Sequence, residues 1–342
     1  MSELSRRRFL TRAGAGAAIG AVPLAAPAIA AAKPRPAGKP VSSSTILKLF
    51  AKLPGTVGLK IMAPPAHGDR GLLIEHNASQ QMFVGSAIKT FALCETLRLN
   101  DGPDVTAKIA AQDLALDESV WNADSQSFNP PNLTGKVSVR TALEAMICHS
   151  DNTATDMTFK HVGVGNIRKL IRTLGLTQTL VPDSTRIFFG YILGAKDYKH
   201  YTWKDLTESD GKFVKPPLNQ VETLASSADD FVSYYSRALR GRLFKHEQTL
   251  SQFREVLAMG DAIWLLPVPL GASAFVKGGS IDTPGFHAVC VPGGMLFEDR
   301  WVFFSITLNW DSPAETDQAT VNQFLAAGSR ALTLVKNSLS VH

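Results

Sequence analysis

Apolar residues recur along the chain with two different spacings, and these spacings predict its secondary structure. Ile46, Leu47 and Phe50 follow a helical spacing, which predicts a short amphipathic helix beginning near Ser42. Two shorter apolar runs, at 57–62 and 71–76, are typical of strands, because proline and glycine turn signals separate them. The ordered part of the chain is therefore expected to open with one helix and two strands.

The middle of the chain follows the longer spacing that is typical of helices. Helices are predicted at 86–99, 139–148, 152–161, 166–174, 225–239 and 248–259. Residues 182–222 are polar, aromatic and interrupted by glycine and proline, which predicts a long irregular segment. The chain then returns to three predicted strands, at 274–278, 287–291 and 301–308, and closes with a helix at 318–339.

This order of elements predicts an α/β protein made of α+β layers. The two early and three late strands can form one antiparallel five-stranded sheet, flanked by the N- and C-terminal helices, if the chain leaves the sheet and returns. The sheet layer would comprise about 42–85 and 265–342, and an all-helical lobe about 86–264. A cleft between two such parts is a common place for a ligand.

The composition is that of a globular protein, with 342 residues of which 45% are hydrophobic. The formal net charge of +5 is concentrated at the start, because residues 1–32 carry +3 and leave +2 for the remainder. A nearly neutral body gives no electrostatic reason to expect nucleic acid or an anionic membrane as a partner.

The first 32 residues resemble a signal for export. Ser5-Arg6-Arg7-Arg8-Phe9-Leu10 is similar to a twin-arginine motif, and a Gly/Ala-rich stretch and Ala28-Ile29-Ala30 follow it. We interpret 1–32 as a signal peptide, 33–41 as a proline-rich linker and 42–342 as the domain. The twin-arginine export machinery is the expected partner, and the expected location is periplasmic or secreted, without stable membrane insertion after cleavage.

The cysteines and histidines do not indicate a metal site. Cys94, Cys148 and Cys290 are odd in number and widely spaced, so they are interpreted as small apolar side chains rather than a disulfide framework. The eight histidines show no ligand spacing with acids or cysteines. No metal and no cofactor is expected.

Three short motifs carry side chains suited to acyl transfer. In Ser86-Ala87-Ile88-Lys89, the serine and the lysine lie one helical turn apart, where a neutral lysine is able to take the serine's proton. Ser209-Asp210-Gly211-Lys212 has the same spacing, so this motif alone is weak evidence. Ser150-Asp151-Asn152 lies between two predicted helices and also suits a helix cap. Lys277-Gly278-Gly279-Ser280 lies at a predicted strand, where glycines permit a ligand or a bulge.

Taken together and in this order, the three motifs resemble the active-site triplet of class A β-lactamases and penicillin-binding proteins. The flanking residues 83–89 and 145–154 are similar to the same segments of that family. Residues 181–186 look like the stretch that leads into its omega loop. The resemblance covers about residues 42–340 and implies the family's fold, in which a sheet layer packs beside a helical lobe.

The resemblance implies an acyl-serine reaction on a small molecule, namely a β-lactam or an acyl-D-Ala-like amide or ester. Ser86 would be the nucleophile that the substrate carbonyl acylates. Lys89 would be its general base, and Ser150 would relay a proton to the leaving group.

The same resemblance assigns the remaining residues of the triplet. Asn152 would orient the substrate and the lysine base, and Lys277 would tune the proton relay and supply positive potential. Gly279 and Ser280 would bind the substrate, and the backbone N–H groups of Ser86 and Ser280 would form the oxyanion hole.

The sequence departs from the class A pattern in three places. After Thr185-Arg186 there is no acid where the family has the glutamate that positions the deacylating water. Gly278 stands where the family has a hydroxyl residue, and the following strand has no arginine for a substrate carboxylate, with His287 as a candidate substitute. The acids that are candidates to replace the glutamate are Asp197, Asp205, Glu208, Asp210 and Glu222.

Two classes of function remain open at this point. An exported hydrolase would turn over a β-lactam or a related amide or ester, with a D,D-peptidase or esterase as a variant. A penicillin-binding sensor or pseudoenzyme would instead be acylated, or only bind, without turnover. An α/β-hydrolase is excluded because the chain has no Gly-x-Ser-x-Gly sequence.

Overall fold

The computed structural model describes residues 41–66 and 70–340. The predicted signal peptide at 1–32 and nearly all of the predicted linker lie outside these ranges. The strands are β1 (Thr56–Ala63), β2 (Leu72–His76), β3 (Met82–Phe83), β4 (Asp113–Leu116), β5 (Gly135–Ser138), β6 (Ala225–Ser226), β7 (Ser273–Val276), β8 (Gly279–Thr283), β9 (Phe286–Phe297) and β10 (Arg300–Trp310).

The helices form most of the segment between β3 and β7. They are α2 (Ser43–Phe50), the short 3-10 helix η1 (Gly85–Ile88), α3 (Lys89–Leu99), α4 (Val105–Ala111), α5 (Val139–Cys148), α6 (Asn152–Val162), α7 (Val164–Thr173), α8 (Thr185–Ile192), η2 (Tyr198–His200), α9 (Trp203–Glu208), α10 (Ala228–Ala238), α11 (Glu247–Ala258), α12 (Ala262–Leu265) and α13 (Gln318–Leu339).

The main sheet is antiparallel and has the order β2-β1-β10-β9-β7, with β8 also paired to β9. The prediction of one antiparallel sheet, which the chain leaves after its early strands and rejoins with its late strands, is confirmed. The sheet has six strands rather than five, because the strand predicted at 274–278 ends at Val276 and pairing resumes at Gly279. This break places Lys277 and Gly278 outside both strands.

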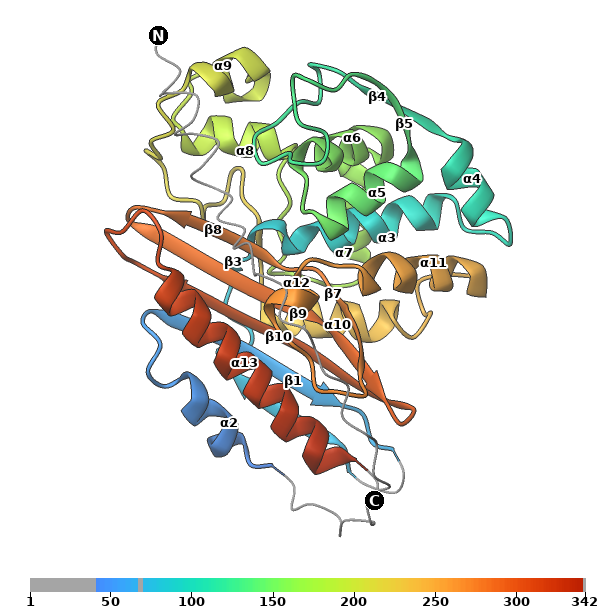
Figure 1. Ribbon diagram of the computed structural model, residues 1–342, viewed down its shortest axis with the longest axis vertical. Coiled ribbons are helices and arrows are strands. Elements are labelled where there is room, and N and C mark those ends of the chain that lie inside the picture. Colours follow the sequence, from blue (N-terminus) through green and yellow to red (C-terminus); the bar gives the residue numbers. More distant parts are fainter. Residues whose placement is uncertain (1–40, 67–69, 341–342) are drawn as a thin grey trace, which may run out of the picture.

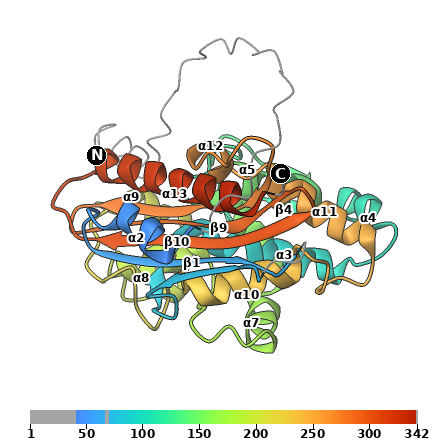
Figure 2. The same cartoon turned by 90° about the horizontal axis from the view of Figure 1, so that it is seen from below.

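Two layers of helices cover the sheet. Figures 1 and 2 show α13 and α2 on one face of the sheet and the helical lobe, with α10 and α3, on the other. Strand β10 contributes side chains to the cores on both faces of the sheet. Phe303 packs in the core of the lobe, whereas Val302 and Phe304 pack in the core under α13. Burial on both faces explains why apolar residues of this strand lie on both of its sides rather than at every second position.

Helix α3 is the centre of the helical lobe. Every residue from Lys89 to Leu97 is buried, so these nine residues of the helix have no solvent face. A helix surrounded by its neighbours on all sides fixes the direction of each side chain. The predicted base, Lys89, therefore starts from a rigid element, directly after the turn that carries the predicted nucleophile.

The segment predicted to be irregular, 182–222, contains the α-helices α8 and α9 and the short 3-10 helix η2 instead. Ser184 caps α8 through the backbone N–H of Ile187, and Thr202 and Asp205 form a reciprocal capping box at the start of α9. Both helices are short, and glycine and aromatic residues in α8 obscure the helical period. The prediction of a helix at 225–239 is also corrected, since β6 precedes the Ser227 cap of α10.

The cysteines of the described residues are free thiols. Cys94 and Cys290 are buried and Cys148 is half-buried, as expected for small apolar side chains. Burial raises the pKa of the Cys94 and Cys290 thiols to about 12 and that of Cys148 to about 11. Cys94 and Cys290 thus pack as small apolar side chains within the core of the lobe.

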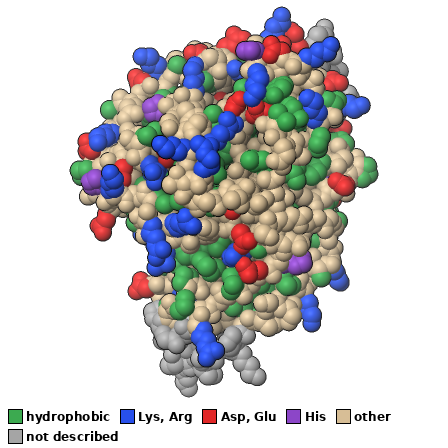
Figure 3. Space-filling model, turned by 180° about the vertical axis from the view of Figure 1, so that it is seen from behind, with side chains coloured by type: hydrophobic (Ala, Val, Ile, Leu, Met, Phe, Trp, Pro, Cys, Tyr) green, Lys and Arg blue, Asp and Glu red, His purple; other side chains and the backbone are tan. Residues whose placement is uncertain are grey.

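The surface of the protein mixes side chains of both charges. On the face seen from behind in Figure 3, basic, acidic and apolar side chains are interspersed. Within residues 41–66 and 70–340, none of the helices has the length and apolar character that a membrane span requires.

Candidate active site

The predicted nucleophile, Ser86, lies in η1, directly before α3. Gly85 enters this turn with a φ of +52°, a left-handed conformation that favours glycine. Ser86 is half-buried, whereas its neighbours Ala87 and Ile88 are fully buried. The serine therefore occupies the accessible point of a tightly packed turn.

Strand β8 approaches this turn backbone to backbone. A Cβ atom on Gly279 would lie 2.6 Å from the backbone nitrogen of Ser86 and 2.2 Å from the carbonyl oxygen of Val84. In the same way, a Cβ on Gly85 would lie 2.9 Å from the backbone nitrogen of Ser280. Two glycines thus bring the backbone N–H groups of Ser86 and Ser280 into the same small region, as an oxyanion hole requires.

Lys89 is fully buried and its amine has three partners. It contacts the carbonyl oxygen of Ser150, lies 2.8 Å from the side-chain oxygen of Asn152, and lies 3.3 Å from the hydroxyl of Ser150. Burial, supported by the nearby positive charge of Lys277, lowers the pKa of Lys89 to about 7 from an ordinary value of 10.5. The amine is therefore substantially neutral near pH 7.

The corner between α5 and α6 holds Ser150 and Asn152 in place. Ser150 has a left-handed φ of +56°, and Asp151 caps α6 by accepting the backbone N–H of Ala154. The second oxygen of Asp151 accepts the backbone N–H groups of Ser127 and Phe128. The corner is thus both a helix cap and the support of two predicted site residues.

Lys277 lies near this group but is engaged elsewhere. Its amine lies 3.0 Å from each carboxylate oxygen of Asp261 and 2.8 Å from the carbonyl oxygen of Gly278. Among the described residues, no hydrogen bond joins Lys277 to Ser150, the partner that a shared proton relay would need. The structure thus joins Lys89 to Ser150 and Asn152, with Ser86 three residues before Lys89, while Lys277 is paired with an acid.

His287, the candidate substitute for a substrate-binding arginine, is buried and fully engaged. One ring nitrogen contacts the carboxylate of Asp282, and the other lies 3.2 Å from the carbonyl oxygen of Ser312. The ring stacks on Trp310 with a centroid separation of 5.1 Å. His287 supports the end of the sheet and has no ring nitrogen left for a substrate.

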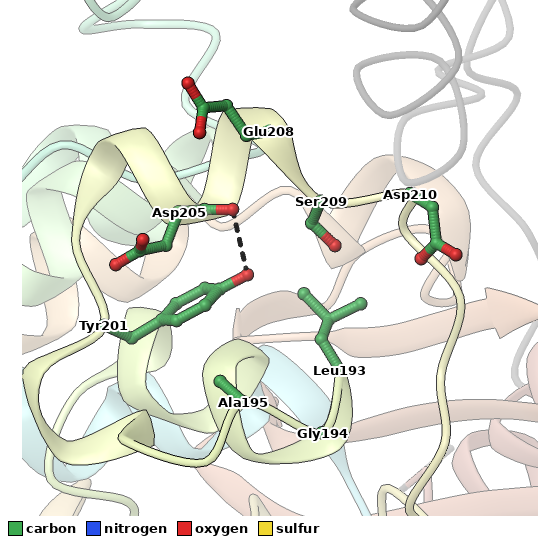
Figure 4. Close-up of a pocket in the computed structure, with 8 residues that line it drawn as sticks. All are labelled: Leu193, Gly194, Ala195, Tyr201, Asp205, Glu208, Ser209 and Asp210. Atoms are coloured by element: carbon green, nitrogen blue, oxygen red, sulfur yellow. Dashed lines mark hydrogen bonds between the residues drawn. The ribbon is translucent and has the colours of Figure 1, made fainter.

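The five acids proposed to replace the omega-loop glutamate have other roles or contacts. The buried Glu222 accepts the backbone N–H of Asp183 and pairs with Lys199, and Asp197 pairs with His200. Asp205, Glu208 and Asp210 line a separate open cavity in the α8–α9 region, where the Tyr201 hydroxyl donates to the backbone oxygen of Asp205 (Figure 4).

A buried polar cluster lies at the start of α8, where the family has its omega-loop glutamate. The residues that form this cluster are Asp156, Thr185 and Asn122. Asp156 accepts hydrogen bonds from the backbone and hydroxyl of Thr185, both at 2.7 Å. Asn122 donates to both side chains, at 2.9 Å to Asp156 and 2.7 Å to Thr185. Burial raises the pKa of Asp156, against the effect of these hydrogen bonds.

Two acids near the lysines were missed by the sequence interpretation, namely Asp261 and Asp124. Asp124 is half-buried with a left-handed φ of +54°, and its backbone oxygen accepts the N–H of Asn152. Burial raises the pKa of its carboxyl to about 6, although the charge of Lys89 opposes this. Neither acid lies within a recognisable motif, so only the packing of loops against α6 and β7 reveals them.

The described residues hold no group of three or more His, Cys, Asp or Glu side chains arranged to bind a metal ion.

The fold is that of the β-lactamase-like serine hydrolase superfamily. A family model described as the beta-lactamase enzyme family matches residues 42–259, more than half of the chain. The chain belongs to this family.

Solved structures show the same fold at low sequence identity. A β-lactamase from Sphaerobacter thermophilus is 17% identical, with a TM-score of 0.62 over 84% of this chain and 94% of that one. A class A β-lactamase from Bacteroides cellulosilyticus is 16% identical, with a TM-score of 0.65 over 86% and 96%. The protein PBP-A is 16% identical, with a TM-score of 0.62 over 86% and 98%.

One curated protein also matches part of the sequence. The mitochondrial coenzyme Q-binding protein COQ10 of Dictyostelium discoideum is 26% identical over 110 residues. This match spans 30% of the present chain and about half, 54%, of that protein. It covers too little of either chain to bear on the site.

Proposed function

We propose that this protein is an exported serine hydrolase that cleaves a β-lactam or a related amide or ester through an acyl group on Ser86. The observation that carries the proposal is the buried, partly neutral amine of Lys89, one turn after Ser86 and bonded to Ser150 and Asn152. Export rests on the twin-arginine-like residues 5–10.

In the acylation step, the neutral amine of Lys89 has two N–H groups and one lone pair. The two shorter contacts, to the Ser150 carbonyl and the Asn152 side chain, account for the N–H groups. The lone pair accepts the proton of Ser86 as its Oγ attacks the substrate carbonyl carbon. The carbonyl oxygen becomes negative and is met by the backbone N–H groups of Ser86 and Ser280.

The tetrahedral intermediate then collapses to the acyl-enzyme. The carbon–nitrogen or carbon–oxygen bond of the substrate breaks, and the proton held by Lys89 passes through the hydroxyl of Ser150 to the leaving atom. Water then attacks the ester carbonyl, gives up one proton, and releases the acid while Ser86 regains its hydrogen. The acyl-enzyme and one molecule of water thus give the free enzyme and the released acid.

Covalent labelling of the purified protein tests the nucleophile. A fluorophosphonate probe or benzylpenicillin should label Ser86, and Ser86→Ala should abolish the label. The matched control is Ser209→Ala, because Ser209 and Lys212 have the same spacing but Lys212 is exposed and not buried. Labelling that persists in Ser86→Ala, or that is lost in Ser209→Ala, would contradict the proposal.

A chromogenic cephalosporin separates the hydrolase from a penicillin-binding sensor. A hydrolase gives steady colour beyond one equivalent of enzyme, whereas a sensor gives a burst of one equivalent and then stops. The missing omega-loop glutamate favours the sensor, because that residue positions the deacylating water in the family. The presence of Ser86, Lys89, Ser150 and Asn152 together favours the hydrolase. A D,D-peptidase or esterase would turn over an acyl ester in preference to the cephalosporin.

A further inference from the structure

Residues 260–262 pack against residues 276–278, so that each residue of the first segment meets one residue of the second. A Cβ on Gly260 would lie 2.1 Å from the carbonyl oxygen of Val276, so only glycine allows this approach. At the other end, a Cβ on Gly278 would lie 2.8 Å from the Cβ of Ala262. The start of α12 thus occupies the space that a hydroxyl side chain at position 278 would need.

Between these two contacts, Asp261 meets Lys277. An ammonium group has three N–H donors, and Lys277 has three acceptors within 3.0 Å, namely both oxygens of Asp261 and the carbonyl of Gly278. Lys277 is fully buried, while Asp261 is 30% exposed. The cation is therefore neutralised and its donors are used by the protein itself.

Lys89 and His287 are similarly engaged. Lys89 has three oxygen partners on residues 150 and 152, and both ring nitrogens of His287 have partners. Neither group offers a donor to a substrate carboxylate.

Acidic side chains near these engaged basic groups add negative charge. The Asp124 carboxylate makes no hydrogen bond among the described residues and lies close enough to Lys89 to interact with its charge. Among the described residues named here, a substrate anion would meet the negative charges of Asp124 and Asp261, while the cation of Lys277 is already paired.

We infer that Asp261, held against Lys277 by the packing of 260–262 on 276–278, is a specificity-determining residue that slows acylation by substrates with a carboxylate beside the scissile bond. The inference rests on the proposed function and specifies a preference for substrates that are uncharged beside the scissile amide or ester bond. Asp261 acts on the substrate through Lys277, whose charge it cancels.

Benzylpenicillin and its methyl ester test this directly, because the ester removes the carboxylate charge and keeps the β-lactam. The wild-type protein should be acylated faster by the methyl ester. Asp261→Asn keeps an oxygen acceptor for Lys277 but removes the negative charge, so it should raise the rate ratio of benzylpenicillin to methyl ester about tenfold, equivalent to about 1.4 kcal/mol.

Two variants serve as controls. Asp113→Asn makes the same change of charge at an exposed position on β4 and should leave the ratio unchanged. Asp261→Glu keeps the charge and should retain the preference for the methyl ester.

The outcomes separate the two proposals. A wild-type preference for benzylpenicillin, or an Asp261→Asn ratio within about twofold of wild type, overturns the inference while Ser86-dependent acylation stands. The wild-type ratio decides the matter even if the Asp261→Asn protein fails to fold. Absence of Ser86-dependent acylation by both compounds and by a fluorophosphonate overturns the proposed function, and the inference with it.

Discussion

The amine of Lys89 lies 2.8 Å from the side-chain oxygen of Asn152, which is 63 residues further along the chain. The same amide donates through its nitrogen to the carbonyl oxygen of Ala123 at 3.0 Å, which fixes which end of the amide faces the lysine. Asn152 thus orients the base, and it does so from the capped first turn of α6.

Removing this amide should impair acylation more than stability. We expect Asn152→Ala to lower the rate constant of Ser86 acylation by about 100-fold, since a positioned base is worth about 10²–10⁴ in rate. Stopped-flow acylation and thermal unfolding measure the two effects. Asn132→Ala, at an exposed loop position, is the control and should change neither. An Asn152→Ala rate within a few-fold of wild type would remove the orienting role.

Acylation should depend on pH through Lys89. Only the neutral amine accepts the proton of Ser86, and its pKa is lowered to about 7, so the rate should fall on acidification below about 7 and level off above it. Lys277→Met removes a nearby cation and should move the midpoint to higher pH. The pre-steady-state rate across about pH 5 to 9 gives both midpoints, and a flat profile would contradict the assignment.

Gly279 should tolerate no side chain. The added methyl of Gly279→Ala would meet the backbone of Val84, Ser86 and Ala87 at 2.2–2.6 Å, so β8 must move away from η1 and the oxyanion donors separate. We expect acylation to fall by about 100-fold or more, the effect of losing an oxyanion-hole donor. Gly165→Ala, on α7 with no atom near the added methyl, is the control and should retain full activity. Normal acylation of Gly279→Ala would rule out this geometry.

The N-terminal residues should direct export. Changing both Arg6 and Arg7 to lysine should leave uncleaved precursor in the cytoplasm of the expressing cell, because a twin-arginine signal depends on the guanidinium pair. Arg12→Lys alters an arginine outside the motif and should be exported normally. Cell fractionation followed by immunoblotting measures both, and efficient export of the double variant would refute the signal.

Much of the fold could be predicted from the sequence, because the spacing of apolar residues within a segment reflects which side of that helix or strand is buried. The closing helix at 318–339 was predicted at its observed bounds, since α13 has one apolar face against the sheet. The helices α8 and α9 were missed because their caps lie within a stretch that glycine, proline and aromatic residues make irregular. The break between β7 and β8 was missed because Lys277 and Gly278 are placed by α12, which is distant in the local pattern.

The residues of the candidate site are likewise of two kinds, those within local motifs and those that only tertiary packing places near the lysines. The Ser86–Lys89 spacing and the Ser150–Asn152 corner are local features, so a motif was able to indicate them. Asp261 and Asp124 depend on how loops pack on other elements, and no local pattern marks a carboxylate that will meet a buried lysine. The expected role of Lys277 in the proton relay rested on the resemblance alone, and its ion pair with Asp261 emerges only in three dimensions.

Peptide mapping of the covalent adduct, by mass spectrometry after brief reaction with a β-lactam methyl ester, tests the central claim most directly. The account predicts one acyl group per chain, attached to Ser86 and absent from the Ser86→Ala protein. An adduct on another residue, or no adduct under conditions in which the substrate is consumed, would contradict it.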